Sequence, residues 1–153
     1  MITCHLVMFN NNIVAYRNDL PVPLQEETAA ALIKNTEDTT VVMGSKTFAF
    51  SGQFIPNRKY AILTRLANKV PRGVKHISSI QEMEDATSED FSIIGGISTI
   101  KSCLPIADLF VVYKVDKDVE GDTTFWIPET FIEFNTTFLT EDQREIIYEP
   151  MAN

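Results

Sequence analysis

The 153-residue sequence is poor in cysteine and lacks long hydrophobic runs, and each absence excludes a class of protein. Cys4 and Cys103 are its only cysteines, so a disulfide framework and Cys-x-x-Cys zinc spacing are both excluded. No apolar run approaches the roughly 20 residues of a membrane-spanning helix. The N-terminus also lacks the basic region and cleavage site of a signal peptide. We therefore expect one soluble, cytoplasmic domain over residues 1–153, with no metal site.

Basic residues are also scarce, with 13 Lys and Arg against 21 Asp and Glu and a net charge of −8. This balance argues against nonspecific nucleic-acid binding, which needs a basic surface. The charge is unevenly spread, because residues 39–81 contain no acid but hold 7 of the 13 basic residues. Two interpretations stay open for this segment: a solvated face, or a local site for an anionic ligand.

Hydrophobic periodicity predicts alternating strands and helices. Strands are expected at residues 2–9, 13–15, 39–43, 59–63, 74–77, 91–94, 110–115, 130–138 and 144–148. Helices are expected at 24–34, 46–50, 79–86 and 98–103. This order predicts a single-domain α/β fold, with a mostly parallel central sheet, helices on both faces and an antiparallel C-terminal edge.

Two segments share a strand–glycine–helix design: Val-Val-Met-Gly-Ser-Lys-Thr at 41–47 and Ile-Ile-Gly-Gly-Ile-Ser-Thr at 93–99. Glycine lets a ligand approach the backbone closely, and the free N–H groups of a helix start attract phosphate. Neither segment is a GxGxxG fingerprint or a P-loop, and such turns also arise for packing alone. Because ligands of open α/β sheets bind at the carboxyl ends of strands, the pair predicts an anion site there.

Two further polar groups stand at the ends of predicted elements. Arg65 and Thr64 follow a strand, where a guanidinium can pair with a phosphate, although a plain surface arginine fits as well. Glu26 and Glu27 lie in the first turn of the 24–34 helix. A partly buried carboxylate there would have a raised pKa and donate protons near neutral pH, whereas an exposed one only complements the helix dipole.

Five motifs in series resemble the dihydrofolate reductase family: residues 42–48, 52–59, 62–65, 93–96 and 119–125. Residues 18–21 resemble that family's mobile active-site loop. The resemblance implies NADPH-dependent reduction of 7,8-dihydrofolate to tetrahydrofolate, with hydride transfer to pterin C6 and protonation of N5, in support of one-carbon and thymidylate metabolism. A related NADPH-dependent pterin or pyrimidine reductase and a non-catalytic binding module are the alternatives. No partner other than the small-molecule substrate is expected, and the chain is expected to be a monomer.

The resemblance also assigns residues to the cofactor, NADPH. Leu63, Thr64 and Arg65 would surround the adenosine and its 2′-phosphate, which favours NADPH over NADH. Asp122 belongs to a loop that steadies the mobile loop in relatives. The full predicted cofactor set is Leu6, Val7, Ile13, Ala15, Asn18, Asp19, Leu20, Gly44, Ser45, Lys46, Thr47, Leu63, Thr64, Arg65, Gly95, Gly96, Ile97, Ser98, Thr99 and Thr123.

On the substrate side the resemblance makes Glu27 the catalytic acid. Counting forward from Leu20 selects Glu27, whereas counting back from Asn35 selects Thr28, whose hydroxyl cannot relay a proton as a carboxylate does. Arg58 would pair with the substrate's glutamate α-carboxylate, Ile55 would pack on its aminobenzoyl ring, and the Ile94 carbonyl would meet the pterin. The full predicted substrate set is His5, Glu27, Leu32, Ile55, Arg58, Ile94 and Tyr113.

The substrate side departs from the family pattern more than the cofactor side does. Val22 stands where the family usually has tryptophan, and Ala31 or Leu32 replaces an aromatic residue. Tyr113 stands where a small hydroxyl residue normally bonds the acid. His5 faces the pocket by alternation along the first strand. These departures predict that the folate half of the site is the unusual one.

Overall fold

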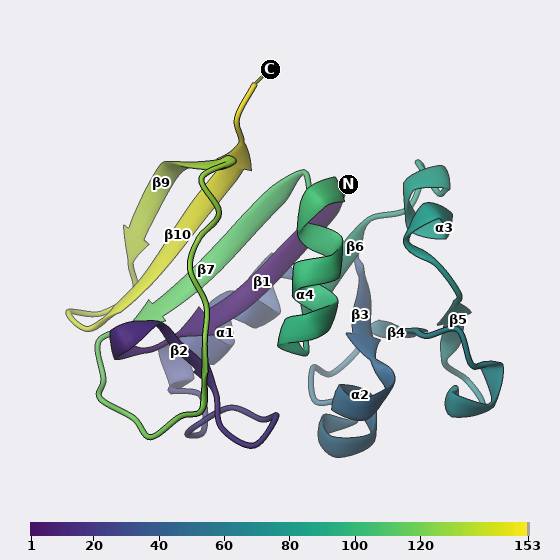
Figure 1. Ribbon diagram of the computed structural model, residues 1–153, viewed down its shortest axis with the longest axis horizontal. Coiled ribbons are helices and arrows are strands. Elements are labelled where there is room, and N and C mark those ends of the chain that lie inside the picture. The colour runs from purple at the N-terminus through teal and green to yellow at the C-terminus, as the bar shows by residue number, and fades with distance from the viewer. Residues whose placement is uncertain (153) are drawn as a thin grey trace.

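An eight-stranded sheet forms the centre of the computed structural model, which describes residues 1–152 (Figure 1). The strand order is β5-β4-β3-β6-β1-β7-β10-β9. Neighbours from β5 to β7 pair in parallel, whereas β10 runs antiparallel to β7 and to β9. The strands are β1 (Ile2–Met8), β3 (Thr40–Gly44), β4 (Lys59–Leu63), β5 (Lys75–Ile77), β6 (Phe91–Gly95), β7 (Leu109–Val115), β9 (Phe131–Phe138) and β10 (Gln143–Pro150). The predicted fold class is confirmed.

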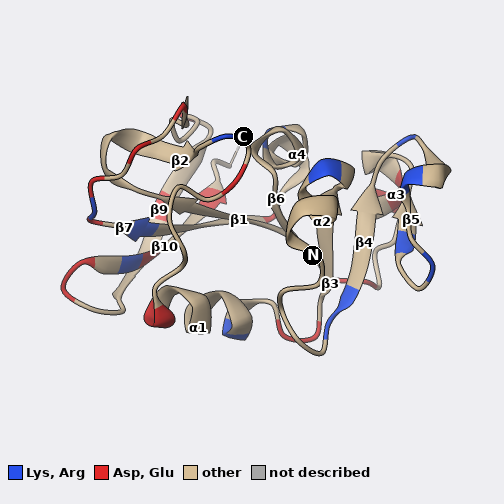
Figure 2. Ribbon diagram, turned by 90° about the horizontal axis from the view of Figure 1, so that it is seen from below, with Lys and Arg blue, Asp and Glu red and all other residues tan. Residues whose placement is uncertain are grey.

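Helices cover both faces of this sheet. They are α1 (Glu26–Asn35), α2 (Ser45–Ser51), α3 (Ile80–Asp85) and α4 (Ile97–Cys103). In the view of Figure 2, α1 and α4 lie on opposite sides of the strands. Two core clusters correspond to the two faces: Ile100 and Cys103 of α4 join Phe110 in one, and Ala31 and Leu32 of α1 join the other. A chain of this length therefore closes two apolar layers around one sheet.

Where element boundaries differ from the predicted ones, they differ by one or two residues. Helix α1 begins at Glu26 because Gln25 is extended (φ −70°, ψ 152°) after the proline-containing segment. In α3 the Ser79 side chain accepts a hydrogen bond from the N–H of Glu82, so Ser79 is the N-cap and stays outside the helix. The sequence did not predict β8 (Thr123–Thr124), which pairs with β2 (Ile13–Ala15) in a separate two-stranded sheet.

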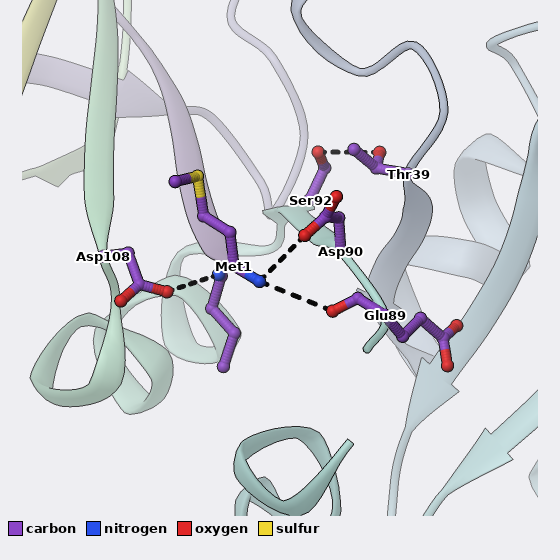
Figure 3. Close-up of polar contacts among 7 residues, drawn as sticks. Met1, Thr39, Glu89, Asp90, Ser92 and Asp108 are labelled. Carbon is purple, nitrogen blue, oxygen red and sulfur yellow. Dashed lines mark hydrogen bonds and ion pairs between the residues drawn. The ribbon is translucent and has the colours of Figure 1, made fainter. Parts of the chain in front are cut away.

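Polar contacts tie together the amino ends of the central strands (Figure 3). The N-terminal ammonium of Met1 pairs with Asp90 Oδ1 at 2.9 Å, and the N–H of Ile2 donates to Asp108 Oδ2 at 2.7 Å. The Thr39 hydroxyl donates to Ser92 Oγ at 2.9 Å, which joins the segment before β3 to the start of β6. The opposite, carboxyl end of the sheet carries the turns and loops that form the site. No helix within residues 1–152 is long and apolar enough to cross a membrane.

Candidate active site

The two glycine turns interlock at the carboxyl ends of β3 and β6. A Cβ at Gly44 would lie 2.6 Å from Thr99 Oγ1, and a Cβ at Gly96 would lie 2.8 Å from Thr47 Oγ1. Each turn therefore accommodates a hydroxyl residue from the first turn of the other turn's helix, at a distance that only glycine permits. The two segments that share a sequence design are thus parts of one structure.

A cavity of about 400 Å³ opens beside these turns. It is bounded by β1, the end of β3, the end of β6 and the loop that follows β2, and most of its wall is apolar. Of the predicted site residues it brings together His5, Leu6, Val7, Ala15, Asn18, Asp19, Leu20, Leu32, Thr47, Ile94, Gly95, Gly96, Ile97 and Tyr113. This volume and this apolar character are typical of a site for a small organic ligand.

Six other residues line the cavity that are not in the predicted cofactor and substrate sets: Val14, Leu24, Met43, Ser51, Phe54 and Ile100. Met43 is fully buried directly before Gly44, so the strand-end rule that selected Gly44 would also have selected it. Phe54 is 48% exposed and lies within a motif whose neighbours were assigned to the substrate. No sequence pattern indicated Leu24, because its position in the cavity wall depends on where α1 begins.

The loop over the cavity is held in a tight turn. Tyr16 and Asp19 exchange backbone hydrogen bonds of 2.9 and 3.1 Å around Arg17 and Asn18, which have positive φ values of 50° and 66°. The N–H of Arg17 donates to Asp122 Oδ2 at 3.0 Å, and this bond is the main cause of the lowered pKa of Asp122. A side chain at Gly121 would overlap Ile13. The 121–122 segment therefore positions the loop that supplies Asn18, Asp19 and Leu20 to the cavity wall.

Two cations near the glycine turns keep their charges free. Lys46 is exposed in the first turn of α2, and Arg65 is exposed just after β4. Ion pairs within residues 1–152 join Met1 to Asp90 and Lys75 to Glu89, so neither Lys46 nor Arg65 is neutralised by an acid. Both remain available to an anionic ligand.

Arg58, by contrast, is held in place by carbonyl and hydroxyl oxygens. Its guanidinium donates to the Ile33 carbonyl at 2.6 Å, to Thr36 Oγ1 at 3.3 Å, and to the carbonyls of Pro56 and Asn57. These partners fix the side chain at the C-terminal end of α1 without neutralising its charge. Arg58 lies in a neighbouring polar groove and does not line the cavity.

Thirteen predicted site residues lie outside the cavity wall: Ile13, Glu27, Gly44, Ser45, Lys46, Ile55, Arg58, Leu63, Thr64, Arg65, Ser98, Thr99 and Thr123. Gly44 and Thr99 contribute to the turn contact described above. Ile55 is 1% exposed, and it belongs to the α1-side core, where its N–H donates to Tyr60 Oη at 2.7 Å. The roles of all thirteen toward a ligand stay predictions.

Neither candidate acid position reaches the cavity. Thr28 is buried, and its N–H and hydroxyl donate to Gln143 Oε1 at 3.1 and 2.6 Å. The amide nitrogen of Gln143 donates in turn to Glu27 Oε1 at 2.9 Å, on the exposed side of the same turn. Gln143, at the start of β10, therefore caps the first turn of α1 from 115 residues away, and both candidate positions are engaged in that cap.

His5 and Tyr113 are the buried polar groups of the cavity wall. His5 Nδ1 lies 2.9 Å from Tyr113 Oη, and the rings stack with an interplanar angle of 17° and centroids 6.0 Å apart. The two side chains are 2% and 0% exposed. Burial lowers the pKa of His5 to about 4 and raises the pKa of Tyr113, so both are neutral at pH 7.

Comparison with known proteins identifies the family. A model of the family described as dihydrofolate reductase matches residues 1–149. The chain belongs to the dihydrofolate reductase family. It is 32% identical over 145 residues to a dihydrofolate reductase of Bacillus subtilis (strain 168), with 94% of this chain and 84% of the relative covered. It is 28% identical over 129 residues to a dihydrofolate reductase of Staphylococcus aureus, with 84% and 79% covered.

Solved structures of the dihydrofolate reductase family share the fold. A dihydrofolate reductase from Enterococcus faecalis, solved with NADP(H) and RAB-propyl, superposes with a TM-score of 0.84 at 20% identity. The match covers 98% of this chain and 96% of that one. Family membership, the reductase class and the α/β fold predicted from the motifs are therefore confirmed.

Proposed function

We propose that this chain reduces 7,8-dihydrofolate to tetrahydrofolate with NADPH. The observation that carries the proposal is the single cavity at the carboxyl end of the sheet, which joins the two glycine turns to the α1 side of β1 and β7. A reductase of this class must hold two planar rings in contact and exclude water from them. A largely apolar cavity with few polar groups meets that requirement.

The cofactor end of the site fits NADPH. The interlocked glycines leave room for a ligand to approach the backbone, and Thr47 and Thr99 place their hydroxyls at that point. Lys46 would meet the pyrophosphate, and Arg65 with Thr64 would meet the 2′-phosphate. Two exposed cations free of carboxylate partners support this assignment. Bound NADPH would supply the hydride, and the relative from Enterococcus faecalis was solved with NADP(H).

The substrate end of the site is bounded by His5, Tyr113, Leu32 and Ile94. The pterin would lie against these residues, with Leu32 packing on it in place of the usual aromatic residue. Arg58 would pair with the α-carboxylate of the glutamate tail. Its guanidinium is already held by the Ile33 carbonyl at the end of α1, so little conformational entropy is lost when a carboxylate binds.

The same proposal includes a monomeric enzyme of the cytoplasm formed as one domain over residues 1–153. Cys4 and Cys103 are both free and buried, in keeping with a reducing compartment. Sedimentation of the purified protein at micromolar concentration, with a mass of 17.3 kDa expected, tests the monomer.

NADPH oxidation followed at 340 nm with 7,8-dihydrofolate tests the activity. We expect turnover with NADPH that exceeds turnover with NADH at equal concentration. NADPH binding without turnover at micromolar enzyme would instead favour a non-catalytic binding module. Turnover with other reduced pterins but not with dihydrofolate would favour a related pterin reductase.

A further inference from the structure

Four polar side chains from four elements form a chain beside the cavity. His5 of β1 contacts Tyr113 of β7 at 2.9 Å, and the Asn35 amide nitrogen of α1 donates to Tyr113 Oη at 3.1 Å. The same nitrogen donates to Glu145 Oε2 of β10 at 3.1 Å. Exposure rises along the chain, from buried His5 and Tyr113 to half-buried Asn35 and Glu145.

The donors and acceptors of this chain are fixed by the carboxylate at its end. An ionised Glu145 only accepts, so the Asn35 atom facing it is the amide nitrogen, whose second hydrogen goes to Tyr113 Oη. Tyr113 then donates its own hydrogen to His5 Nδ1. His5 in this state carries its hydrogen on Nε2, a buried atom with no partner within residues 1–152.

A second state differs from the first only in the position of protons. In this state His5 Nδ1–H donates to Tyr113 Oη. The Tyr113 hydroxyl hydrogen then no longer bonds His5, and Nε2 becomes a free acceptor. Both states are neutral. Because burial holds the pKa of His5 near 4, a neutral imidazole is the stable form at pH 7 in either state.

His5 lies between two cavities. It lines the active-site cavity together with Tyr113, and it also lines a second cavity of about 230 Å³ together with Asn35. The second cavity lies at the amino ends of the strands, where Met1, Thr39 and Asp90 form part of its wall (Figure 3). Its volume has room for several water molecules.

Within the described chain, the active-site cavity has no carboxylate near His5 and Tyr113. Glu27 is exposed and bonded to Gln143, and it does not line the wall. Asp19 is the one carboxylate of the cavity wall in the described chain, and it lies on the loop, where Oδ1 accepts from the N–H of Leu20. On the α1 side of the cavity wall, His5 and Tyr113 are therefore the titratable groups of the described chain.

We propose that Tyr113 and His5 form the proton path to the substrate, with the Tyr113 hydroxyl donating to pterin N5. This inference rests on the proposed function. In the step, the Tyr113 O–H bond breaks as N5–H forms, and the His5 Nδ1 hydrogen moves to Tyr113 Oη. Nε2 takes up one proton from solvent, so one proton enters the pair and one leaves it. The product is the first arrangement above, which is also the resting state, and proton exchange with solvent converts it to the second arrangement before the next donation.

Tyr113 is the catalytic residue of this path, and His5, Asn35 and Glu145 are positioning residues. Asn35 orients the tyrosine oxygen, and Glu145 orients Asn35. The titratable groups facing His5 are Tyr113 from β7, Glu145 of β10 through Asn35, and the Met1 amine and Asp90 across the second cavity. Helix α1 contributes only the neutral Asn35, and β6 contributes Ile94.

Nitrogen NMR of the histidines tests the pair without turnover. The chain has two histidines, so a His76→Gln variant assigns the His5 signals. We expect a neutral His5 with Nδ1 as acceptor and Nε2 protonated, and titration only near pH 4. Tyr113→Phe should shift the Nδ1 signal. Titration of His5 near its ordinary pKa of 6.5, or an Nδ1 signal that ignores Tyr113→Phe, would overturn the pair.

Single-turnover hydride transfer to dihydrofolate tests the proton step. Tyr113→Phe should slow the step at least tenfold at pH 7, the lower range for general acid catalysis, with NADPH affinity unchanged. The deficit should shrink toward pH 5 as solvent protonates N5. His5→Asn, which keeps a polar group beside Tyr113 but cannot relay protons, should show the same pH dependence with a smaller loss.

A matched control is Tyr148→Phe, a half-buried tyrosine that packs on Phe110 in the other core cluster. It should leave the rate unchanged. If the wild type is active and Tyr113→Phe transfers hydride at the same rate, this inference is wrong and the proposed function still stands. The same conclusion follows if Glu27→Gln slows hydride transfer as much as Tyr113→Phe does. A wild type without turnover would overturn the proposed function, and with it the assignment of the substrate proton.

Discussion

The two ends of the cavity are built from the same sheet but by different means. At the cofactor end, short-range sequence rules determine the structure: a strand ends, glycine turns the chain, and a helix starts with a hydroxyl residue. At the folate end, the wall depends on contacts between residues more than 70 positions apart, such as Asn35 with Tyr113 and Thr28 with Gln143. We infer that the first end tolerates few local changes, whereas the second is free to exchange one polar network for another.

Gly96→Val should have the largest effect on NADPH affinity, because it places a side chain in a turn that requires glycine. A Cβ there already meets Thr47 Oγ1 at 2.8 Å, and the two further methyl groups of valine would force apart the turns at which we propose that NADPH binds. Overpacking of up to about 3 kcal/mol corresponds to a loss of NADPH affinity of up to roughly 150-fold. Fluorescence titration with NADPH measures it.

The contact with Thr47 gives this prediction its control. Thr47→Ala removes Oγ1, so the Gly96→Ala and Thr47→Ala double variant should bind NADPH better than Gly96→Ala alone. Equal affinities would mean that the hydroxyl contact does not limit the turn.

Gln143→Leu should have the next largest effect, on the stability of the folate end. It removes the acceptor of the Thr28 N–H and hydroxyl and the donor to Glu27, leaving buried groups unpaired. Unpaired buried groups of this kind cost about 2–3 kcal/mol together. The free energy of unfolding in urea measures the loss.

Gln81→Leu is the control for Gln143→Leu. Gln81 is an exposed glutamine of α3 whose side chain bonds only Asp85. The free energy of unfolding of the Gln81→Leu variant should therefore stay within about 0.5 kcal/mol of wild type. A Gln143→Leu variant as stable as Gln81→Leu would show that the α1 cap contributes little.

The sequence predicted the two glycine turns well because their signals are local. Strand ends, glycine and helix starts identified Gly44, Thr47, Gly95 and Gly96, and the structure places the two turns together. The folate end could be predicted only as a departure from a family pattern. No local sequence signal links Thr28 to Gln143. Counting residues from Leu20 or from Asn35 therefore could not show that Glu27 and Thr28 both bond Gln143 at the start of α1.

Arg65→Gln sharpens the comparison at the cofactor end. If the guanidinium meets the 2′-phosphate, its loss removes a charge-assisted pair worth about 1.5–3 kcal/mol, or roughly 10- to 150-fold in NADPH affinity. NADH affinity should stay the same. Arg72→Gln, an exposed arginine of the same acid-free segment, should change neither. Equal losses for both cofactors would remove the 2′-phosphate from the assignment.

The pH dependence of stability probes the folate end through His5. The buried imidazole has its pKa lowered from 6.5 to about 4, so between these values the unfolded chain binds a proton that the folded chain does not. Stability therefore rises with pH across this window and is lost as pH falls through it. From pH 7 to pH 5 the loss is about 2 kcal/mol by linkage.

The carboxylates whose pKa is lowered in the fold, Glu82, Glu89 and Asp122, also destabilise the protein on acidification, but at lower pH, around and below their ordinary values. His5→Asn should therefore flatten the urea-unfolding profile between pH 7 and 5 and leave the steeper fall below pH 4 in place. An unchanged slope in that variant would mean that His5 takes up its proton in the folded state. The neutral pair at the folate end would then be wrong, while the cofactor end would stand unaffected.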